Sequence, residues 1–338
     1  MVRLAPYLPW WKRQAIALIS TTTLVPNSVL ALASRSPEDA TTVCGKMTLH
    51  DKPRDLEYAA NAWNPTSEGF QCLTVNEDDT NAWFNAPWLW EGDKDNVHSY
   101  PHVKFQSSKL PLPLAEITSM RLTASWMMTA GSLETETPKF SSNEWDENKS
   151  SLNELGTVAN AAFDMFLDAD LTNSTDSVLA GIELMIWIGS VGDPWPLKTK
   201  TLGTQKLGDR EFTLYYGKNQ RDHHVLTWVP HEDVDDITEF DEDVSPLLEY
   251  VWRNGLIANS TYLGIVEFGS ETWQSSANVT FSTASYSLTI NATGASSSGS
   301  KISPLPLGCC DLDSSGWSRQ RICGRLLLVV SLALWGII

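Results

Sequence analysis

GIELMIWIG, at residues 181–189, is the stretch that decides the fold. Successive side chains of a β-strand point to opposite faces, so one face of this segment would be wholly aliphatic. That face consists of Ile182, Leu184, Ile186 and Ile188. The other face carries Glu183, Met185 and Trp187. An exposed strand face does not normally combine Met and Trp with its only charge, whereas a ligand groove does. The segment therefore predicts a strand between a hydrophobic core and a groove.

Short apolar or alternating runs of the same kind fill the chain from about residue 44 to 292. Val, Ile, Thr, Trp and Tyr are common in these runs, and Gly, Asn, Asp and Pro separate them. The clearest runs are 70–75, 116–128, 211–217, 224–230, 262–269 and 279–290. Many strands with turn residues between them and almost no helical periodicity predict an all-β sandwich or barrel.

One short helix is predicted, with Ser245 as its N-cap, Pro246 at its first position and Gly255 just beyond its end. The polar, acidic segment 129–155 lacks an apolar period and is interpreted as a surface loop insertion.

Both ends of the chain are interpreted as processing segments. Residues 1–33 combine basic residues, an apolar run and a small-residue site, which predicts a secretory signal; a membrane anchor is the alternative. Residues 34–292 form the predicted domain, and 293–315 a Ser- and Gly-rich linker. The apolar tail 316–338 resembles a GPI-anchor signal, although a mispredicted gene end would look similar. We expect an extracellular protein, secreted or held at the cell surface.

The composition narrows the class of partner. The chain of 338 residues has a net charge of −17, which repels phosphate and argues against nucleic acid and anionic membranes. Its 15 tryptophans are a weak indication of carbohydrate, because an indole face suits a sugar ring, although core packing would absorb several. Five N-glycosylation motifs support secretion; they begin at Asn148, Asn173, Asn259, Asn278 and Asn291.

The cysteines and histidines suggest a disulfide and no metal. Cys44 and Cys72 lie within the fold, and an oxidising compartment favours a bridge between them. No role is assigned to the cysteines of the tail, Cys309, Cys310 and Cys323. No CxxC or HExxH motif occurs, so we expect neither a metal nor a cofactor.

A second acidic segment, IVEFGSETW at 265–273, also places carboxylates on one strand face. That face would carry Glu267, Gly269, Glu271 and Trp273. An ordinary surface position is the simpler interpretation of Glu267, and it is less convincing for Glu271. For Glu183, the alternative to a catalytic role is a structural ion pair. Two carboxylates facing one aromatic groove are what glycosidic cleavage requires: one acts as nucleophile and the other as acid and then base.

Five segments, in order, resemble glycoside hydrolase family 12, over roughly residues 44–292. They are NAW with GFQC (61–72), WLWEGDKDNVHSYP (88–101), AAFDMF (161–166), IELMIWI (182–188) and FGSE (268–271). The resemblance implies a concanavalin A-like jelly roll of two antiparallel sheets. It implies that Glu183 is the nucleophile, that Glu271 is the acid/base, and that Asp164 hydrogen-bonds Glu183. It also pairs Cys72 with Cys44.

The resemblance and the groove pattern together suggest a set of sugar-binding residues. They are Asn61, Trp63, Trp88, Trp90, Met185, Trp187 and Trp195. The chain departs from the family's pattern at His98, where Lys is usual, at GSVGDPWPL (189–197), which adds Trp195, and in the insertion 129–155, which could cover or extend the cleft. These departures bear on the substrate and not on the chemistry.

The resulting hypothesis is a secreted, monomeric, retaining endo-β-1,4-glucanase that needs no cofactor and acts on cellulose-like glucan or xyloglucan. A different class remains open, because the same sandwich serves lectins: a carbohydrate-binding protein without turnover. A surface-displayed protein in which enzymatic activity is secondary is a third interpretation.

Overall fold

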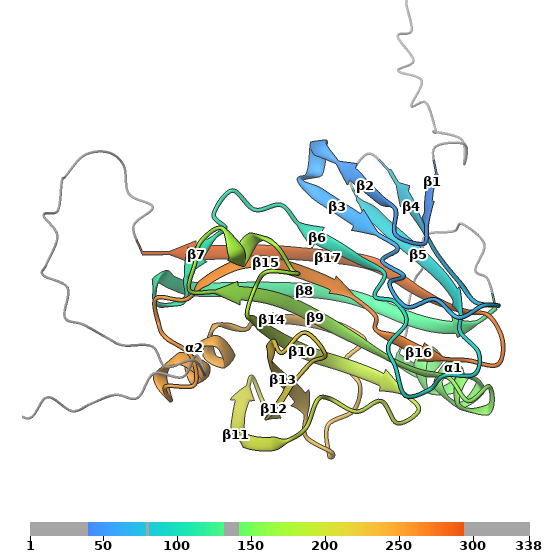
Figure 1. The fold of residues 1–338 in the computed structure, drawn as a ribbon. Coiled ribbons are helices and arrows are strands. Elements are labelled where there is room, and N and C mark those ends of the chain that lie inside the picture. Colours follow the sequence, from blue (N-terminus) through green and yellow to red (C-terminus); the bar gives the residue numbers. More distant parts are fainter. Residues whose placement is uncertain (1–39, 79–80, 132–141, 294–338) are drawn as a thin grey trace, which may run out of the picture. The chain divides into compact units, whose positions relative to one another are not determined.

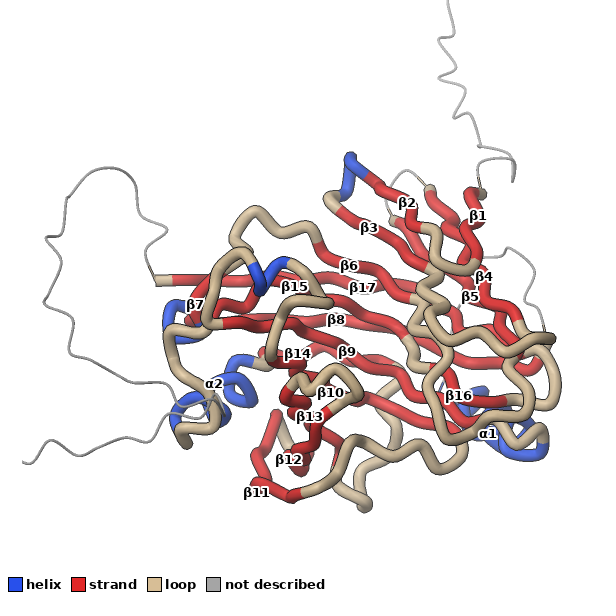
Figure 2. Tube along the Cα trace, in the orientation of Figure 1, coloured by secondary structure: helices blue, strands red, loops and turns tan. Residues whose placement is uncertain are grey.

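The computed structural model describes residues 40–78, 81–131 and 142–293. The predicted signal, most of the linker and the apolar tail lie outside these residues. Within them, strands dominate, and Figure 2 shows the helical parts as short pieces at the margins of the sheets. The first strand begins at Thr41 and the last ends at Ala292.

One of the two sheets has six strands. Its order is β1 (Thr41–Cys44), β4 (Phe70–Glu77), β5 (Ala82–Leu89), β17 (Val279–Ala292), β8 (Ile117–Ala130) and β14 (Glu239–Asp243). We call it the back sheet. The two longest strands, β8 and β17, run side by side in it (Figure 1).

The second sheet, called the front sheet, carries the remaining strands. Its main order is β11 (Lys200–Leu207), β12 (Arg210–Lys218), β13 (His224–Pro230), β10 (Ile182–Val191), β9 (Val158–Asp168), β15 (Tyr262–Gly269), β6 (His102–Phe105), β3 (Leu56–Ala59) and β2 (Thr48–Asp51). Two short strands join it at the side: β16 (Thr272–Gln274) pairs with β9, and β7 (Leu112–Pro113) with β15.

The hydrophobic core lies between the two sheets. The aliphatic face predicted for 182–188 is there, since Leu184, Ile186 and Ile188 are fully buried in the main cluster. Aromatic rings join the layers: Phe268 of the front sheet lies 6.0 Å from Phe281 of the back sheet, measured between ring centroids. Burial of such rings is the main source of stability in a sandwich. The predicted all-β jelly roll is confirmed.

One strand pair departs from the predicted antiparallel arrangement. β10 and β13 run parallel, with Glu183 beside Val225 and Met185 beside Thr227. Parallel neighbours need a crossover connection, and here β11 and β12 supply it.

The segment 129–155 was wrongly predicted to be only a loop, because it contains helix α1 (Ser142–Glu154). The helix is mostly polar, but Trp145 and Leu152 are seven residues apart, which is two turns, and both are buried. The Trp145 ring lies 4.8 Å from that of Trp126. Two apolar residues are too few to give a periodic signal, yet they dock the helix.

The predicted second helix is α2 (Ser245–Arg253), with a correction at its start. Val244 is the N-cap, and Asp243 accepts the hydrogen bond from the backbone N–H of Ser245 at 3.0 Å. Gly255 follows the end with φ +70°, as a C′ residue should. Three single-turn 3-10 helices complete the elements of the described residues: η2 (Lys52–Arg54), η3 (Leu114–Glu116) and η4 (Asn173–Thr175). No helix of the described residues has the length and apolar character needed to cross a membrane.

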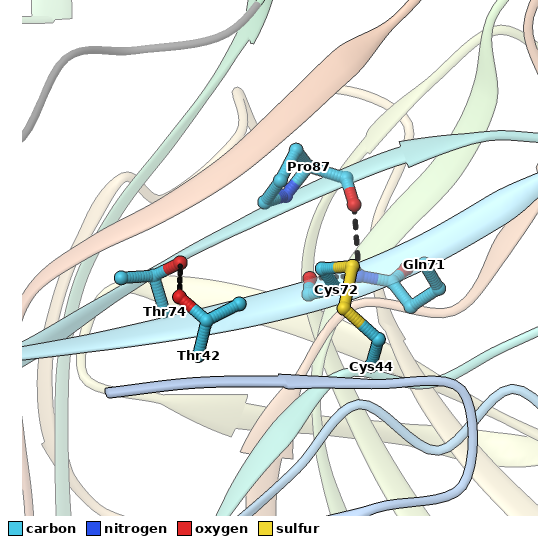
Figure 3. Close-up of a disulfide and its surroundings, with 6 residues drawn as sticks. All are labelled: Thr42, Cys44, Gln71, Cys72, Thr74 and Pro87. Carbon is cyan, nitrogen blue, oxygen red and sulfur yellow. Dashed lines mark hydrogen bonds between the residues drawn. A yellow bond between two sulfur atoms is a disulfide. The ribbon is translucent and has the colours of Figure 1, made fainter. Parts of the chain in front are cut away.

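The predicted disulfide between Cys44 and Cys72 is formed and links β1 to β4 (Figure 3). The two cysteines are direct neighbours in the antiparallel register. Thr42 and Thr74 add a hydroxyl contact of 2.9 Å along the same pair, and the Gln71 side chain donates to the Pro87 carbonyl on β5. The bridge therefore fastens an edge strand that is only four residues long.

Candidate active site

A cleft of about 900 Å³ lies on the face of the front sheet that points away from the core. Several of the residues predicted for catalysis and sugar binding line it. They are Asn61, Trp63, Asp164, Glu183, Met185, Trp187, Trp195 and Glu271. The period of two along β10 explains this, because it directs Glu183, Met185 and Trp187 opposite to the aliphatic core face.

Glu183 projects from β10 into the cleft. The side-chain amide of Asn219 donates to its Oε2 at 3.2 Å. Burial raises the pKa of Glu183 to about 7, while the hydrogen bond from Asn219 and the charge of Arg221 act against the rise. Both opposing groups come from the loop between β12 and β13. That loop therefore stabilises the ionised form of Glu183, which is the form a nucleophile needs.

Glu271 lies between β15 and β16 and is held by Asn160 of β9. The Asn160 side-chain amide donates to Glu271 Oε2 at 2.5 Å, and the backbone N–H of Glu271 donates to Asn160 Oδ1 at 2.8 Å. Burial and the charge of Glu183 raise the pKa of Glu271 to about 8. The raised pKa lets Glu271 keep its proton near neutral pH, which suits an acid beside a nucleophile.

Asp164 lies on β9, next to Met185 on one side and Glu267 on the other. Burial, and then the charge of Glu183, raises the pKa of Asp164 well above its usual range. Its Oδ1 has no hydrogen-bond partner among the described residues. Oδ1 of Asp164 therefore does not make the expected hydrogen bond to Glu183. Asp164 nevertheless lies in the cleft and interacts electrostatically with Glu183.

Glu267 was misjudged as an ordinary surface residue. It is 6% exposed, lines the cleft, and lies 3.4 Å from Nε2 of His102, measured to Oε1. Alternation along β15 had placed it on the same face as Glu271, but nothing in the local sequence indicated its partner His102, which comes from β6. We call Asp164, Glu183, Glu267 and Glu271 the carboxylate cluster.

The aromatic residues of the cleft fall into two kinds. Trp63 and Trp195 are 41% and 46% exposed and present free surface. Trp187 and Trp273 are buried, with ring centroids 6.4 Å apart, and Trp195 lies 6.5 Å from Trp273. The buried pair supports Trp195, which shows how the departure at 189–197 adds an aromatic surface to the cleft.

Trp88 and Trp90 were wrongly predicted to bind sugar. Both are buried in the core and neither lines the cleft. Trp88 belongs to β5 of the back sheet, and the Trp90 indole N–H is shared between the hydroxyls of Ser99 and Thr272. The resemblance of 88–101 to the family's segment suggested a place in the cleft, but the fold buries both rings in the core.

His98, at the family's usual lysine position, is 1% exposed and ties two loops of the cleft together. Its Nδ1 lies 2.5 Å from the Asn64 carbonyl and its Nε2 lies 2.8 Å from the Asp93 carbonyl. Both Asn64 and Asp93 line the cleft. The helix α1 does not line it, so the insertion neither covers nor extends the cleft with described residues.

Three polar residues of the site were not predicted: Asn160, Asn219 and Arg221. Asn160 lies in VANAAFDMF, where its alternation with Asp164 on one strand face was a usable signal. Asn219 and Arg221 lie in a polar hairpin loop that gives no signal by itself. No group of His, Cys, Asp and Glu among the described residues has the arrangement of a metal site.

Comparisons with known proteins agree with this geometry. A family model described as glycosyl hydrolase family 12 matches residues 55–291. A probable xyloglucan-specific endo-β-1,4-glucanase A of Aspergillus flavus is 25% identical over 256 residues, which cover 74% of this chain and 88% of the relative. The crystal structure of Trichoderma harzianum endoglucanase 3 is 27% identical, with a TM-score of 0.59, over 76% of this chain and 100% of the other.

One relative carries a different description. An inactive glycoside hydrolase of Phytophthora nicotianae is 25% identical over 270 residues, which cover 78% of this chain and 97% of the relative.

Proposed function

The chain belongs to glycosyl hydrolase family 12, and from that premise we propose that it is a retaining endo-β-1,4-glucanase with xyloglucan as its first substrate to test. The observation that carries the proposal is the pair Glu183 and Glu271 in one cleft, with the pKa of Glu271 raised by burial and by the charge of Glu183. Xyloglucan is preferred because the fungal relative named above is described as specific for it.

In the proposed reaction, the ionised Glu183 attacks the anomeric carbon while Glu271 protonates the departing glycosidic oxygen. Glu271, now ionised, then removes a proton from the water that releases the sugar from Glu183. Asp164 supports the nucleophile: burial and the charge of Glu183 raise the pKa of Asp164, which disfavours a second negative charge beside Glu183. No step needs a metal or a redox cofactor.

The test measures reducing-sugar release from xyloglucan, mixed-linkage β-glucan and carboxymethyl cellulose by the wild type, Glu183→Gln and Glu271→Gln. We expect release by the wild type and a loss of about 10²–10⁴-fold or more in each variant. An aryl glycoside with a good leaving group, which needs no protonation, should restore the first step of Glu271→Gln but not of Glu183→Gln. Equal release by wild type and Glu183→Gln would exclude Glu183 as nucleophile.

A second candidate function is carbohydrate binding without turnover. The Phytophthora relative that is described as inactive supports this alternative. Calorimetric binding of xyloglucan oligosaccharides with no release of reducing sugar from any substrate would replace the hydrolase proposal with this one. Both Glu variants would then bind as the wild type does.

We also propose that the protein is exported and monomeric. The disulfide and the exposed acceptors Asn259, Asn278 and Asn291 support an extracellular location. Release from cells by a phosphatidylinositol-specific phospholipase would support a GPI anchor, and free protein in the medium would contradict it. Size-exclusion chromatography with light scattering tests the monomer.

A further inference from the structure

His102 has a fixed orientation at the edge of the carboxylate cluster. It begins β6, is 5% exposed, and stacks on Tyr100 with ring centroids 5.1 Å apart and planes 27° apart. Its Nδ1 lies 2.7 Å from the Tyr100 carbonyl oxygen. A carbonyl only accepts, so Nδ1 carries a hydrogen and donates it. The remaining nitrogen, Nε2, therefore faces Glu267 and decides the charge of the ring.

The register of the sheet places His102 and Glu267 on a diagonal. His102 is directly opposite Gly269, and Glu267 is directly opposite Lys104. Gly269 leaves room for the imidazole, since a Cβ there would lie 2.8 Å from the Cβ of His102. Diagonal neighbours on one sheet face are within reach of long or aromatic side chains. The contact of 3.4 Å between Nε2 and Oε1 follows from this geometry.

A proton on Nε2 satisfies both groups. An imidazole nitrogen is a stronger base than a carboxylate oxygen, which favours a proton on Nε2 that is donated to Glu267. The pair is then an imidazolium and a carboxylate with no net charge. Without that proton, two lone-pair atoms would face each other in a poorly solvated place, which is costly.

Glu267 is close enough to the reacting groups for its charge to matter. Its strand neighbour is Asp164, and its charge raises the pKa of both Asp164 and Glu183. Other charged groups near Glu267 are Lys104 directly across from it, Glu57 across from Lys104, and Glu271 beyond Gly269. Further along the cleft lie Lys46, Asp93, Asp95, Lys218 and Arg221, of which Arg221 lowers the pKa of Glu183. Among the described residues, no ion pair joins Lys104 to Glu267.

We propose that His102 is a positioning residue that neutralises Glu267 and thereby keeps Glu183 ionised and able to attack. Without the imidazolium, the cluster would gain one negative charge beside the nucleophile. A nearby negative charge disfavours ionisation of a carboxyl group, so a smaller fraction of Glu183 would be ionised at any given pH. This role deepens the proposed glucanase function and rests on it.

The test compares the acidic limb of kcat/KM against pH in the wild type and four variants. We expect His102→Gln to move that limb upward by about half a pH unit or more, because Glu267 is left unpaired. Glu267→Gln should leave the limb at or below the wild-type position and never raise it, because it removes a charge that raises the pKa of Glu183. The double variant His102→Gln/Glu267→Gln should return the limb to the wild-type position. Lys104→Gln, which removes one positive charge without breaking the ion pair, should move the limb less than His102→Gln.

A merely structural role for His102 predicts something else. In that case His102→Gln would lower kcat or the melting temperature without moving the acidic limb. The double variant would not restore the lost kcat or melting temperature. Either result overturns the proposal. A melting curve of each variant identifies those that fail to fold.

A readout independent of turnover separates this proposal from the glucanase function. Nitrogen-15 NMR of the His102 ring at neutral pH should show both nitrogens protonated in the wild type and only Nδ1 protonated in Glu267→Gln. Identical protonation in the two proteins would refute the ion pair even in an active enzyme. An inactive wild type with the expected spectra would refute only the glucanase function.

Discussion

Asn160 and Glu271 exchange three hydrogen bonds across the front sheet: two through the Asn160 side chain and one from its backbone N–H to the Glu271 carbonyl at 3.1 Å. Glu271 lies outside any strand, so these contacts replace the support that a sheet would give. The amide hydrogen bond to Oε2 also works against the rise in the pKa of Glu271.

Asn160→Ala should therefore make the Glu271 side chain less firmly held and should also change its pKa. We expect kcat to fall about tenfold, which corresponds to roughly 1.4 kcal/mol for the loss of the two hydrogen bonds made by the Asn160 side chain. Removal of a contact that lowers the pKa of Glu271 should move the alkaline limb of the pH profile upward. Steady-state kinetics from mildly acid to alkaline pH measure both effects, and an alkaline limb that stays in place would contradict this assignment.

Asn219→Ala should act on the opposite limb. Activity falls with decreasing pH as Glu183 takes up a proton, and falls with increasing pH as Glu271 loses one, so the profile should be bell-shaped. Asn219 lowers the pKa of Glu183, so its loss should raise the acidic limb and narrow the bell. Arg221→Gln is the matched variant and should shift the same limb in the same direction, without any hydrogen bond to Glu183 being broken.

Trp63→Ala and Trp195→Ala should weaken substrate binding. Each exposed indole that stacks on a sugar contributes about 1 kcal/mol, so KM should rise about fivefold per variant, with kcat changed less. Trp88→Phe is the comparison, since its ring is buried in the core and should change the melting temperature and not KM. A KM unaffected by Trp195→Ala would remove that residue from the sugar-binding set.

Gly269→Ala should destabilise the domain through a backbone clash. An added Cβ would lie 2.2 Å from the carbonyl oxygen of Pro101, a distance at which strands β15 and β6 must move apart. We expect the free energy of unfolding to fall by about 1–3 kcal/mol, as in other overpacked sites. Chemical denaturation measures it. Gly181→Ala is the control, because Gly181 has an ordinary φ and a Cβ there would meet only the Asp168 carboxylate, at 3.3 Å.

The strands were predictable because alternation and turn residues are local signals. The run 224–230 coincides with β13, and 262–269 with β15. The same alternation placed Glu183 opposite the aliphatic core face, and the resemblance to the family supplied the catalytic roles. The parallel pairing of β10 with β13 was not predictable, since strand direction depends on the order of distant strands.

The errors share one cause, which is that a sequence pattern does not show what lies across the sheet. Trp88 and Trp90 lie on one face of a run, but that face meets the core. Glu267 looked exposed because its partner, His102, comes from another strand. Only two buried apolar residues, Trp145 and Leu152, dock α1, and two are too few to give a periodic signal.

The position of β17 has a consequence for biosynthesis. This last strand lies between β5 and β8, so it holds together a back sheet whose other members were all translated earlier. Until the ribosome has released about residue 292, the back sheet exists as two separate halves, and the cleft has no complete layer behind it. The domain must therefore finish folding after nearly all of it has been made, and a nascent chain truncated before β17 would expose core surface that favours aggregation.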